Sequence, residues 1–303
     1  MTQIKKSLVC ILVCLLIAAI FLCACTRNEK IVYTMVNVCD EGQQADAHVL
    51  QFKDGTVYVI DAGGGNAIVR KKLALFLKIN NIDVIDKLFI SHAHKDHYEG
   101  IIDVIEAGIK IKALYFNIPD REACDREKPW GCDYDHINKT LQFMKVQGIP
   151  VQTVKTGDIF NPQETAVLKV LAVYDGKNTP VGETDINDAS AIMKLEYGEE
   201  SILFAGDLNM KLGNFLVQNP ENLKSDILKV PHHGTEGVAP DTFFDAVSPK
   251  LALVPSPKGL WLNIRSKRIR EYFSSRNIPV LVSGIDGDVT VILYKDRYEV
   301  VKK

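Results

Sequence analysis

The sequence lacks an excess of charge of either sign, and it contains no low-complexity segment. Its 36 lysines and arginines are balanced by 38 aspartates and glutamates, which gives a formal net charge of −2. This balance excludes a polybasic protein that holds nucleic acid through its overall charge, because such binding depends on cationic side chains that neutralise phosphates. Since no long linker interrupts the chain, one large domain is favoured over two small ones.

Cysteine is also sparse. Three cysteines follow Cys25 in the sequence. Cys124 and Cys132 lie in one polar segment, and they either form a disulfide, which an oxidising exterior permits, or stay unpaired. The sequence does not decide between these alternatives. Cys39 ends an apolar, strand-like run and is expected to be a small core residue.

An export signal is predicted at the N-terminus. Two lysines precede an uninterrupted apolar run over residues 8–24, which is the layout of a secretory signal. The run ends in Leu-Cys-Ala-Cys, with Cys25 last, and resembles the bacterial lipobox, in which signal peptidase cuts before a diacylated cysteine. The alternative is a plain transmembrane anchor, since the run is about as long as the ~17 residues that can just span a bilayer. We expect a signal peptide over residues 1–24 and one mature domain over residues 25–303.

Either arrangement places the mature domain outside the cytoplasm. We expect a lipoprotein at the extracellular face of the cell membrane, anchored through lipid on Cys25, and we infer no obligate protein partner. Removal of the two lysines of the signal changes the formal charge from −2 to about −4, which is −2 minus 2.

The first half of the chain begins with strands and then alternates strands with helices. Runs typical of strands lie at residues 31–38, 47–52 and 56–60, with an Asp-Gly hairpin turn between the last two. The pattern then predicts helices at 66–79, from 98 through 105, and at 137–147, and strands at 87–90, 113–117 and 152–154.

The second half repeats this arrangement. Strands are predicted at 167–173, 190–197, 201–205, 227–230 and 251–254, helices near residue 212 and at 265–274, and a closing hairpin at 280–283 and 289–294 around Asp286 and Gly287. Two β-rich halves, each with helices, indicate an α/β protein with two sheets packed face to face and helices outside.

A dense group of metal-binding residue types follows the predicted strand at 87–90. His92, His94, Asp96 and His97 lie within six residues. Imidazole and carboxylate are ordinary zinc ligands, and a loop that leaves a strand end can turn several side chains toward one point. We expect His92 and His94 to bind one ion and Asp96 and His97 to bind a second.

This pattern resembles the signature of the metallo-β-lactamase superfamily. Three other segments, one before it and two after it, resemble further motifs of that superfamily and occur in the same order along the chain. Asp61, in Asp-Ala-Gly-Gly, resembles the aspartate that supports the metal loop. Asp207, in Phe-Ala-Gly-Asp, resembles the aspartate that bridges both ions, and His232 and His233 resemble the last histidine motif. The resemblance implies an αββα four-layer sandwich of two mixed sheets with helices outside, and a site for two Zn²⁺ ions, which Mn²⁺ can replace.

The sequence leaves the choice between His232 and His233 open. Adjacent residues of an extended segment point in opposite directions, so one is expected to bind metal and the other to support the site or contact substrate. Asp46 is a candidate for supporting the site, whereas His48 is expected to be a strand histidine without a role.

The resemblance narrows to the branch that includes the extracytoplasmic domain of ComEC-type competence proteins, over residues 36–291. The shared features are a Gly-Gln turn near the start, the Asn-x-x-Ser of Asn187 and Ser190, and His-His-Gly-Thr. Two departures matter. His136 is the only histidine between His97 and Asp207 and does not resemble a ligand, and a usual substrate-side histidine is missing after Lys258, which is left as a substrate-side candidate.

Two ions in such a site would supply a bridging hydroxide near neutral pH. Asp96 and Asp207 would be the catalytic residues that orient it. The branch resemblance favours phosphodiester bonds, and therefore a nuclease or phosphodiesterase of the competence type, as the leading hypothesis. A phosphorylcholine-esterase-like hydrolase of cell-surface substrates is the alternative, and a non-catalytic DNA-binding module is an alternative of another class.

A basic segment over residues 250–276 bears on the substrate. It offers an interleaved set of cations and one aromatic residue: Lys258, Trp261, Arg265, Lys267, Arg268 and Arg270. Such a set can hold a nucleic-acid strand by backbone charge and base stacking. The favoured alternative is a solvated helix face with Ile269 and Phe273 turned inward. The sequence leaves the actual substrate, the metal, the oligomeric state and the pathway open.

Overall fold

The computed structural model describes residues 29–235 and 237–301. The predicted signal peptide and Cys25 lie outside the described residues, so both stay predictions. No helix within the described ranges is long and apolar enough to cross a membrane.

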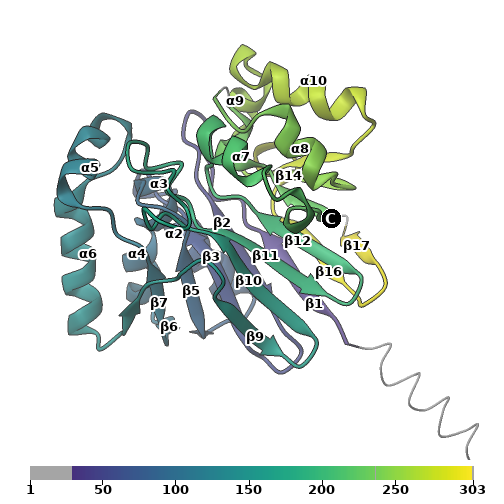
Figure 1. Ribbon diagram of the computed structural model, residues 1–303. Helices are drawn as coiled ribbons and strands as arrows, with labels where there is room; N and C mark the ends of the chain where they lie inside the picture. Colours follow the sequence, from purple (N-terminus) through teal and green to yellow (C-terminus); the bar gives the residue numbers. More distant parts are fainter. Residues whose placement is uncertain (1–28, 236, 302–303) are drawn as a thin grey trace, which may run out of the picture.

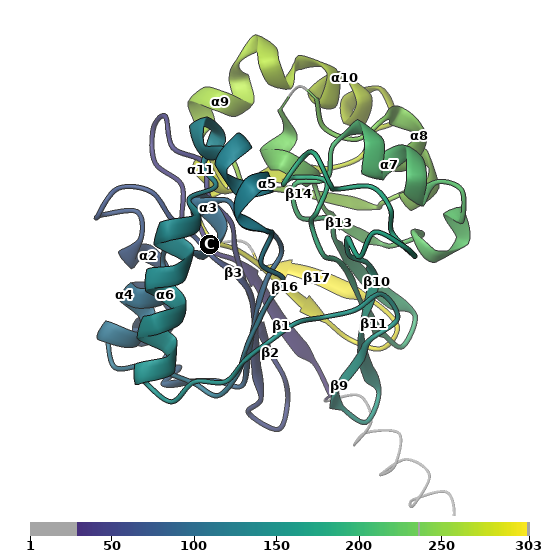
Figure 2. The ribbon, with the colours of Figure 1, turned by 60° about the vertical axis from the view of Figure 1, so that its left-hand side comes forward.

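Two mixed sheets lie face to face at the centre of the molecule (Figures 1 and 2). In the described part, the first sheet has the strand order β17-β16-β1-β2-β3-β5-β7-β8 and the second β15-β14-β13-β12-β11-β10-β9. The strands of the first sheet are β1 (Ile31–Met35), β2 (Ala47–Gln51), β3 (Val57–Ala62), β5 (Lys87–Ile90), β7 (Leu114–Phe116), β8 (Val151–Gln152), β16 (Val289–Leu293) and β17 (Tyr298–Val301). Those of the second are β9 (Ile159–Gln163), β10 (Ala166–Ala172), β11 (Ile192–Tyr197), β12 (Glu200–Phe204), β13 (Ile227–Lys229), β14 (Leu251–Val254) and β15 (Val280–Val282). A separate two-stranded sheet joins β4 (Val84–Ile85) to β6 (Lys110–Ile111).

Helices cover the outer face of each sheet, as the two views show (Figures 1 and 2). Beside the first sheet lie α2 (Lys71–Ile79), α3 (Lys95–Tyr98), α4 (Ile101–Glu106), α5 (Arg121–Arg126) and α6 (Tyr134–Val146). Beside the second lie α7 (Met210–Leu216), α8 (Asp241–Val247), α9 (Lys258–Leu262) and α10 (Lys267–Ser275), and α11 (Ser283–Asp286) follows β15. Short 3₁₀ turns are η1 (Lys128–Trp130), η2 (Pro220–Asn222), η3 (Pro231–Gly234) and η4 (Ile264–Ser266). The predicted α/β four-layer sandwich is confirmed.

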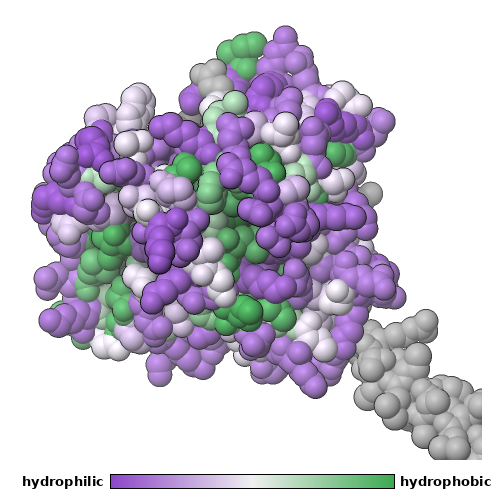
Figure 3. Space-filling view, in the orientation of Figure 1, coloured by the Kyte–Doolittle hydropathy of each residue, from purple (hydrophilic) through white to green (hydrophobic). Residues whose placement is uncertain are grey.

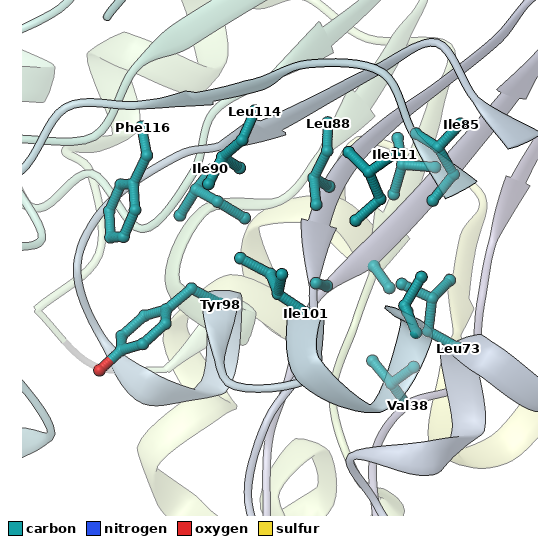
Figure 4. Packing of buried hydrophobic residues seen from close by; sticks show 14 of the residues in the cluster. Val38, Leu73, Ile85, Leu88, Ile90, Tyr98, Ile101, Ile111, Leu114 and Phe116 are labelled. Carbon is teal, nitrogen blue, oxygen red and sulfur yellow. The ribbon is translucent and has the colours of Figure 1, made fainter. Parts of the chain in front are cut away.

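Three apolar cores separate the four layers. Along β3, Val57 and Val59 pack toward the helices of the first sheet, whereas Tyr58 and Ile60 pack between the sheets. This alternation follows from the two-residue period of a strand, and both faces are apolar because both are covered. Figure 4 shows the first core, where Leu88 and Ile90 of β5 face Tyr98 and Ile101. The face of the molecule seen in Figure 3 is mainly hydrophilic, with apolar patches between the hydrophilic areas.

Two predicted helices differ in extent from those observed. The helix predicted over 66–79 begins only at Lys71, because the side chain of Asn66 accepts hydrogen bonds from the backbone N–H groups of Ile68 and Val69 and holds a turn there. The helix predicted from residue 98 is two short helices, α3 and α4. Gly100 separates them, and its Cα lies so close to Ala62 that a Cβ would meet the Ala62 oxygen at 2.2 Å.

The predicted closing hairpin around Asp286 and Gly287 is wrong. β15 pairs with β14 in the second sheet, whereas β16 pairs with β1 and β17 in the first, so the turn connects the two sheets. The Asp286 carboxylate accepts a hydrogen bond from the backbone N–H of Val282, and Gly287 has φ +74. A turn therefore does form here, but it connects a strand of one sheet to a strand of the other. The closing hairpin is β16–β17. The Asp-Gly hairpin between β2 and β3 is confirmed.

Candidate metal centre

The candidate site lies where parallel strands of both sheets end. In the first sheet, β3 ends with Asp61 and Ala62, and β5 leads directly into His92. In the second, β12 leads into Asp207 and β13 into His233. Because the carboxyl ends of parallel strands share one edge, side chains far apart in the sequence meet there, as is usual for ligand sites of α/β proteins.

Four of the predicted residues form one tight, buried cluster. Asp96, His97, Asp207 and His233 each offer a ligand atom, and these atoms all lie within 4.8 Å of one another. Oδ2 of Asp207 is 3.3 Å from Nε2 of His97 and 3.1 Å from Nε2 of His233. Oδ2 of Asp96 is 3.3 Å from the same His233 nitrogen. The structure therefore brings these four together as the sequence predicts.

The donor atoms of this cluster fit a metal ion. The Nδ1 atom of His97 lies 2.9 Å from Oδ2 of Asp61, and Nδ1 of His233 donates to the carbonyl oxygen of Pro255 at 2.7 Å. In the described part of the chain, Nε2 of each ring is buried and has no hydrogen-bond partner. Since the partners of Nδ1 fix each ring and its tautomer, both Nε2 lone pairs can point at a cation.

The charges of the cluster also call for a cation. Burial alone would lower the pKa of His97 and of His233, but the surrounding carboxylates, Asp207 foremost, outweigh it and hold both pKa values well above the ordinary value. Burial opposes ionisation of Asp207 as well, yet the two imidazoles and Lys229 hold its pKa well below its usual range. Without metal, protons on imidazole balance the carboxylates, and a divalent ion would replace those protons.

His92 and His94 lie beside the cluster as a pair. Nε2 of His92 is 3.2 Å from Nδ1 of His94, and the His92 ring centroid is 4.1 Å from that of His97. Burial, above all, lowers the pKa of both, so both rings are neutral at pH 7. Two facing neutral nitrogens can share one cation, which is the arrangement predicted for the first ion.

The structure distinguishes His233 from His232. His233 belongs to the cluster, whereas Nδ1 of His232 lies 2.7 Å from Oδ1 of Asn209 and its side chain lines a neighbouring cleft. The expected reason was wrong: the pair is not extended. Both residues have left-handed backbone angles, φ 47° and 52°, in the turn η3. This turn, rather than strand alternation, sends the two rings to different places.

Lys229 was not predicted as a site residue. It is fully buried, forms an ion pair with Asp46, lies 3.1 Å from Oδ1 of Asp207 and donates to the Gly206 carbonyl oxygen at 2.6 Å. Although burial lowers the pKa of Lys229, Asp46 and Asp207 raise it above its ordinary value. The sequence signal that could have identified Lys229 is its position in β13, two residues after Ile227 and therefore on the same inward face. Its ion pair with Asp46 is consistent with the supporting role expected for Asp46.

Further predicted residues hold the loops in position. Asp61 accepts the backbone N–H of Ser91 at 2.7 Å and its hydroxyl at 2.8 Å. Ser190 accepts the backbone N–H of Asp207 at 3.0 Å, and Asn187 lines the cleft. Gly206, at φ +48, approaches Ser190 so closely that a Cβ would lie 2.6 Å from its side chain. A glycine is therefore required before Asp207.

Two histidines lie outside the cluster, as predicted. His48 is buried in β2, where its Nδ1 lies 3.0 Å from the Tyr33 hydroxyl and burial lowers its pKa to about 3. His136 lies 3.1 Å from the hydroxyl of Tyr98. Neither belongs to a group of possible metal ligands found among the described residues.

A cleft of about 560 Å³ opens over the cluster. It is rich in carboxylates and contains two cations, and the residues that line it are Gln44, His94, Asp96, Glu127, Trp130, Thr184, Asp185, Asn187, Asp207, Lys211, His232 and Arg265. Glu127, Trp130, Asp185 and Lys211 were not predicted from the sequence, because the segments that carry them contain no recognisable motif: Lys211 lies in α7, Trp130 in η1, and the other two in connecting segments. The side chain of Asp96 is 23 % exposed, whereas those of the other three cluster members are nearly inaccessible, so Asp96 is the cluster member most exposed to the cleft.

The predicted basic segment does not form a nucleic-acid groove. Trp261 is 6 % exposed and packs against Gly234, so it is not open for base stacking. Arg268 forms an ion pair with Asp241, and Arg270 donates to backbone carbonyls. The favoured alternative, a solvated helix face, is confirmed, because Ile269 and Phe273 are buried on the inner side of α10. Lys258 is exposed on α9 and does not line the cleft, whereas Arg265 does.

The structure also shows the state of the cysteines. Cys124 and Cys132 form a disulfide, whereas the sequence left open whether they pair. Cys39 is buried and unpaired, as expected for a core residue.

Comparison with known proteins finds a superfamily match and two similar sequences. Residues 41–115 match the model of the metallo-beta-lactamase superfamily. ComE operon protein 3 of Bacillus subtilis is 27% identical over 228 residues, 75% of this chain and 27% of that protein. Recombination protein 2 of Haemophilus influenzae is 22% identical over 268 residues, 88% of this chain and 29% of that protein. This chain thus spans less than a third of the length of either relative.

A solved structure shows the same fold. The metallo-beta-lactamase fold protein YhfI from Bacillus subtilis matches with a TM-score of 0.50 and 13% sequence identity, over 83% of this chain and 96% of that one. At this level of identity the match concerns the fold and not the substrate.

Proposed function

We propose that this chain is a metallo-hydrolase of the metallo-beta-lactamase superfamily, whose model matches residues 41–115, and that it hydrolyses phosphodiester bonds with two bound divalent ions. Zinc is the proposed metal, and manganese is an alternative with the same nitrogen and oxygen ligands. We further propose that it acts at the extracellular face of the membrane as a lipoprotein.

The observation that carries the proposal is the set of buried, unpartnered nitrogens at the floor of an open cleft. Nε2 of His97 and Nε2 of His233 face Asp207, and they have no hydrogen-bond partner among the described residues. Asp96, His97, Asp207 and His233 would hold one ion, and His92 and His94, with Asp207 shared, would hold the other. Pure binding of DNA has no need of such a set, which argues against the non-catalytic module.

When bound, the ions would lower the pKa of a shared water and polarise the phosphoryl oxygen under attack. The protein's own contribution is orientation. Asp96 faces the cleft, and the imidazoles hold its pKa below its usual range against the effect of burial. It therefore stays ionised, and it would help to hold a metal ion and orient a water molecule in the cleft by accepting a hydrogen bond from it. Lys229 and Ser190 fix Asp207, at its carboxylate and its backbone N–H.

The cations of the cleft suit a phosphate. Lys211 and Arg265 lie on its walls, and such side chains form charge-assisted hydrogen bonds with phosphate oxygens. The name of the Haemophilus influenzae relative associates that protein with recombination, a process on DNA. A single-stranded nucleic acid is therefore the first substrate to test.

A second candidate substrate is favoured by the other lining residues. Glu127 and Asp185 are acidic, and Trp130 is an aromatic residue with 76% of its surface exposed beside them. An aromatic face with nearby carboxylates attracts a quaternary ammonium group. A phosphodiester with a cationic head group, such as phosphorylcholine, would place its phosphate at the metal cluster and its ammonium at Trp130.

The test combines metal content with hydrolysis of bis-p-nitrophenyl phosphate. We expect two ions per wild-type chain and a rate that falls at least ~100-fold in Asp207→Asn, since an anion that contacts both ligand imidazoles is lost. Asp245→Asn is the matched control, because Asp245 bonds to Tyr272 and Arg276 on the helical face away from the cleft. Wild type with two ions but no hydrolysis would contradict the phosphodiesterase proposal.

The two substrates are then compared directly. If wild type and Trp130→Ala cleave a single-stranded oligonucleotide at the same rate, nucleic acid is favoured as the substrate, without base stacking on Trp130. If Trp130→Ala cleaves p-nitrophenylphosphorylcholine more slowly than wild type but bis-p-nitrophenyl phosphate at the same rate, the cationic head group is favoured.

A further inference from the structure

The segment between Cys124 and Cys132 packs directly against His94. The backbone N–H of Lys95 donates to the Gly131 oxygen at 3.1 Å, and His94 and Cys132 form an isolated β-bridge. A Cβ on Gly131 would lie only 4.0 Å from the His94 side chain. The disulfide joins the two ends of this segment, so its position relative to His94 is fixed at both ends.

One side chain of this segment faces the free nitrogen of His94. Nε2 of His94 is buried and has no hydrogen-bond partner among the described residues, and Oε2 of Glu127 lies 3.8 Å from it. Glu127 is half-buried in the cleft wall. A half-buried carboxylate is stabilised by a nearby N–H group, and Nε2 of His94 can supply one.

Asp185, the other carboxylate nearby, is already engaged. Its side chain accepts hydrogen bonds from Nδ2 of Asn209 and from the backbone N–H of Asn187, both at 3.0 Å. Glu127 has His94 as its ion-pair partner in the described part of the chain. It is therefore the carboxylate placed to act on His94.

We propose that Glu127 is a positioning residue for His94: the negative charge of its carboxylate, 3.8 Å from Nε2, favours the tautomer with the N–H at Nε2, so that the lone pair of Nδ1, beside Nε2 of His92, is presented to a metal ion. The Cys124–Cys132 disulfide keeps Glu127 in this place. The reason is the tautomer of imidazole. A neutral ring has one N–H and one lone pair, and a carboxylate that holds the N–H leaves the lone pair on the other nitrogen.

The pair formed by His92 and His94 supports this assignment. Their facing atoms are 3.2 Å apart, so a single cation can lie against both only if neither atom carries a proton. Ser91 Oγ lies 3.1 Å from Nδ1 of His92 and can accept a hydrogen bond from it. Glu127 supplies the corresponding negative group for His94, whose Nε2 has no hydrogen-bond partner among the described residues.

The experiment measures Zn²⁺ affinity by competition with a chromophoric chelator, together with the visible spectrum of the Co²⁺-loaded protein. Glu127→Ala is expected to weaken the affinity for one of the two Zn²⁺ ions by about 10- to 100-fold and to alter the Co²⁺ spectrum. Glu127→Gln keeps an acceptor oxygen, so its affinity is expected to fall less. Glu122→Ala is the control, because Glu122 is 89% exposed on the same helix and pairs with Arg126.

A second comparison isolates the disulfide. The double variant Cys124→Ser, Cys132→Ser is expected to lower the affinity for the same ion as Glu127→Ala. It is expected to lower that affinity no further when Glu127 is already alanine. If the losses of affinity in the two variants are fully additive, the disulfide does not act through Glu127. Should the double variant fail to fold, the Glu127 series decides alone.

An affinity and a Co²⁺ spectrum unchanged in Glu127→Ala would overturn the proposal. No substrate is used in either measurement. A wild-type protein that binds two ions without cleaving phosphodiesters would therefore contradict the proposed function and leave this inference standing.

Discussion

The Nζ atom of Lys229 lies 3.1 Å from Oδ1 of Asp207, and both side chains are shielded from solvent. Lys229 also forms an ion pair with Asp46, so one cation from β13 links the start of β2 to the loop after β12. The contact joins the two sheets directly beneath the candidate metal cluster. A buried cation between two carboxylates is costly to disturb, because each carboxylate left behind is buried without compensation.

The first prediction concerns this contact. Lys229→Met removes the charge and keeps the volume, and it is expected to lower the free energy of unfolding by about 3 to 5 kcal/mol. Urea unfolding of the metal-free protein measures this change. The control is Lys250→Met, because Lys250 is 66% exposed where it pairs with Asp226, and its loss is expected to cost about 1 kcal/mol or less. Equal effects of the two substitutions would show that Lys229 has no special role.

A second prediction separates the adjacent histidines. His233→Ala removes a cluster nitrogen that faces Asp96 and Asp207, and it is expected to abolish tight binding of at least one ion. His232→Ala removes a residue of the cleft wall that bonds to Asn209, and it is expected to keep both ions while altering KM or kcat. Metal analysis after dialysis gives the answer. Loss of metal in His232→Ala with retention in His233→Ala would reverse the assignment.

Asp61 provides a third prediction. Its carboxylate lies against Nδ1 of His97 and accepts the N–H and hydroxyl of Ser91. Asp61→Asn removes the charge that orients His97, so the affinity for metal is expected to fall about 10- to 100-fold. Isothermal titration with Zn²⁺ measures it. Asp83→Asn is the control, since Asp83 is an exposed partner of Lys78, and a similar loss in that variant would make the effect non-specific.

The fourth prediction concerns acid stability. Burial lowers the pKa of His48 to about 3, below the value of 6.5 for an exposed histidine. The unfolded chain therefore binds a proton that the folded chain refuses, so the stability from this group is present above pH 6.5 and lost as the pH falls toward 3.

His48→Gln should remove this part of the pH dependence. At about 1.4 kcal/mol per pH unit, wild type is expected to lose roughly 2 to 3 kcal/mol more than His48→Gln between pH 6.5 and 4.5. Urea unfolding of both metal-free proteins at each pH gives the difference. Parallel pH profiles would mean that His48 is protonated in the folded state.

The candidate metal ligands could be predicted from sequence because their chemistry is local and their order is fixed. His92, His94, Asp96 and His97 follow one strand within six residues, and a loop can converge them regardless of the rest of the fold. Asp207 and the pair of His232 and His233 were identified through motif order, and the structure brings Asp207 and His233 to the same cluster.

The residues that sequence missed act through distant contacts. Lys229 has no metal-binding chemistry, and its importance depends on Asp46, which lies 183 positions earlier in the chain. Glu127 reaches His94 only because a disulfide-closed segment folds over it. Trp261 shows the converse: beside several cations its residue type allowed a stacking surface as the less favoured alternative, and the structure instead packs it against Gly234 in the core.

The misassigned closing hairpin has a similar cause. Asp286 and Gly287 form a real turn, but a turn does not determine which strands pair. β15 is parallel to β14, whereas β16 is antiparallel to β1, where Met35 pairs with Val289, 254 positions later in the chain. Pairing over such separations is set by the whole apolar pattern and not by the local turn.

The most direct measurement of the central claim is anomalous scattering at the zinc absorption edge from crystals grown with Zn²⁺. We predict two peaks about 3.5 to 4 Å apart, both in contact with Asp207, one bounded by Asp96, His97 and His233 and the other by His92 and His94. The absence of any peak at these residues under saturating Zn²⁺ would contradict a metal-dependent function for this cleft.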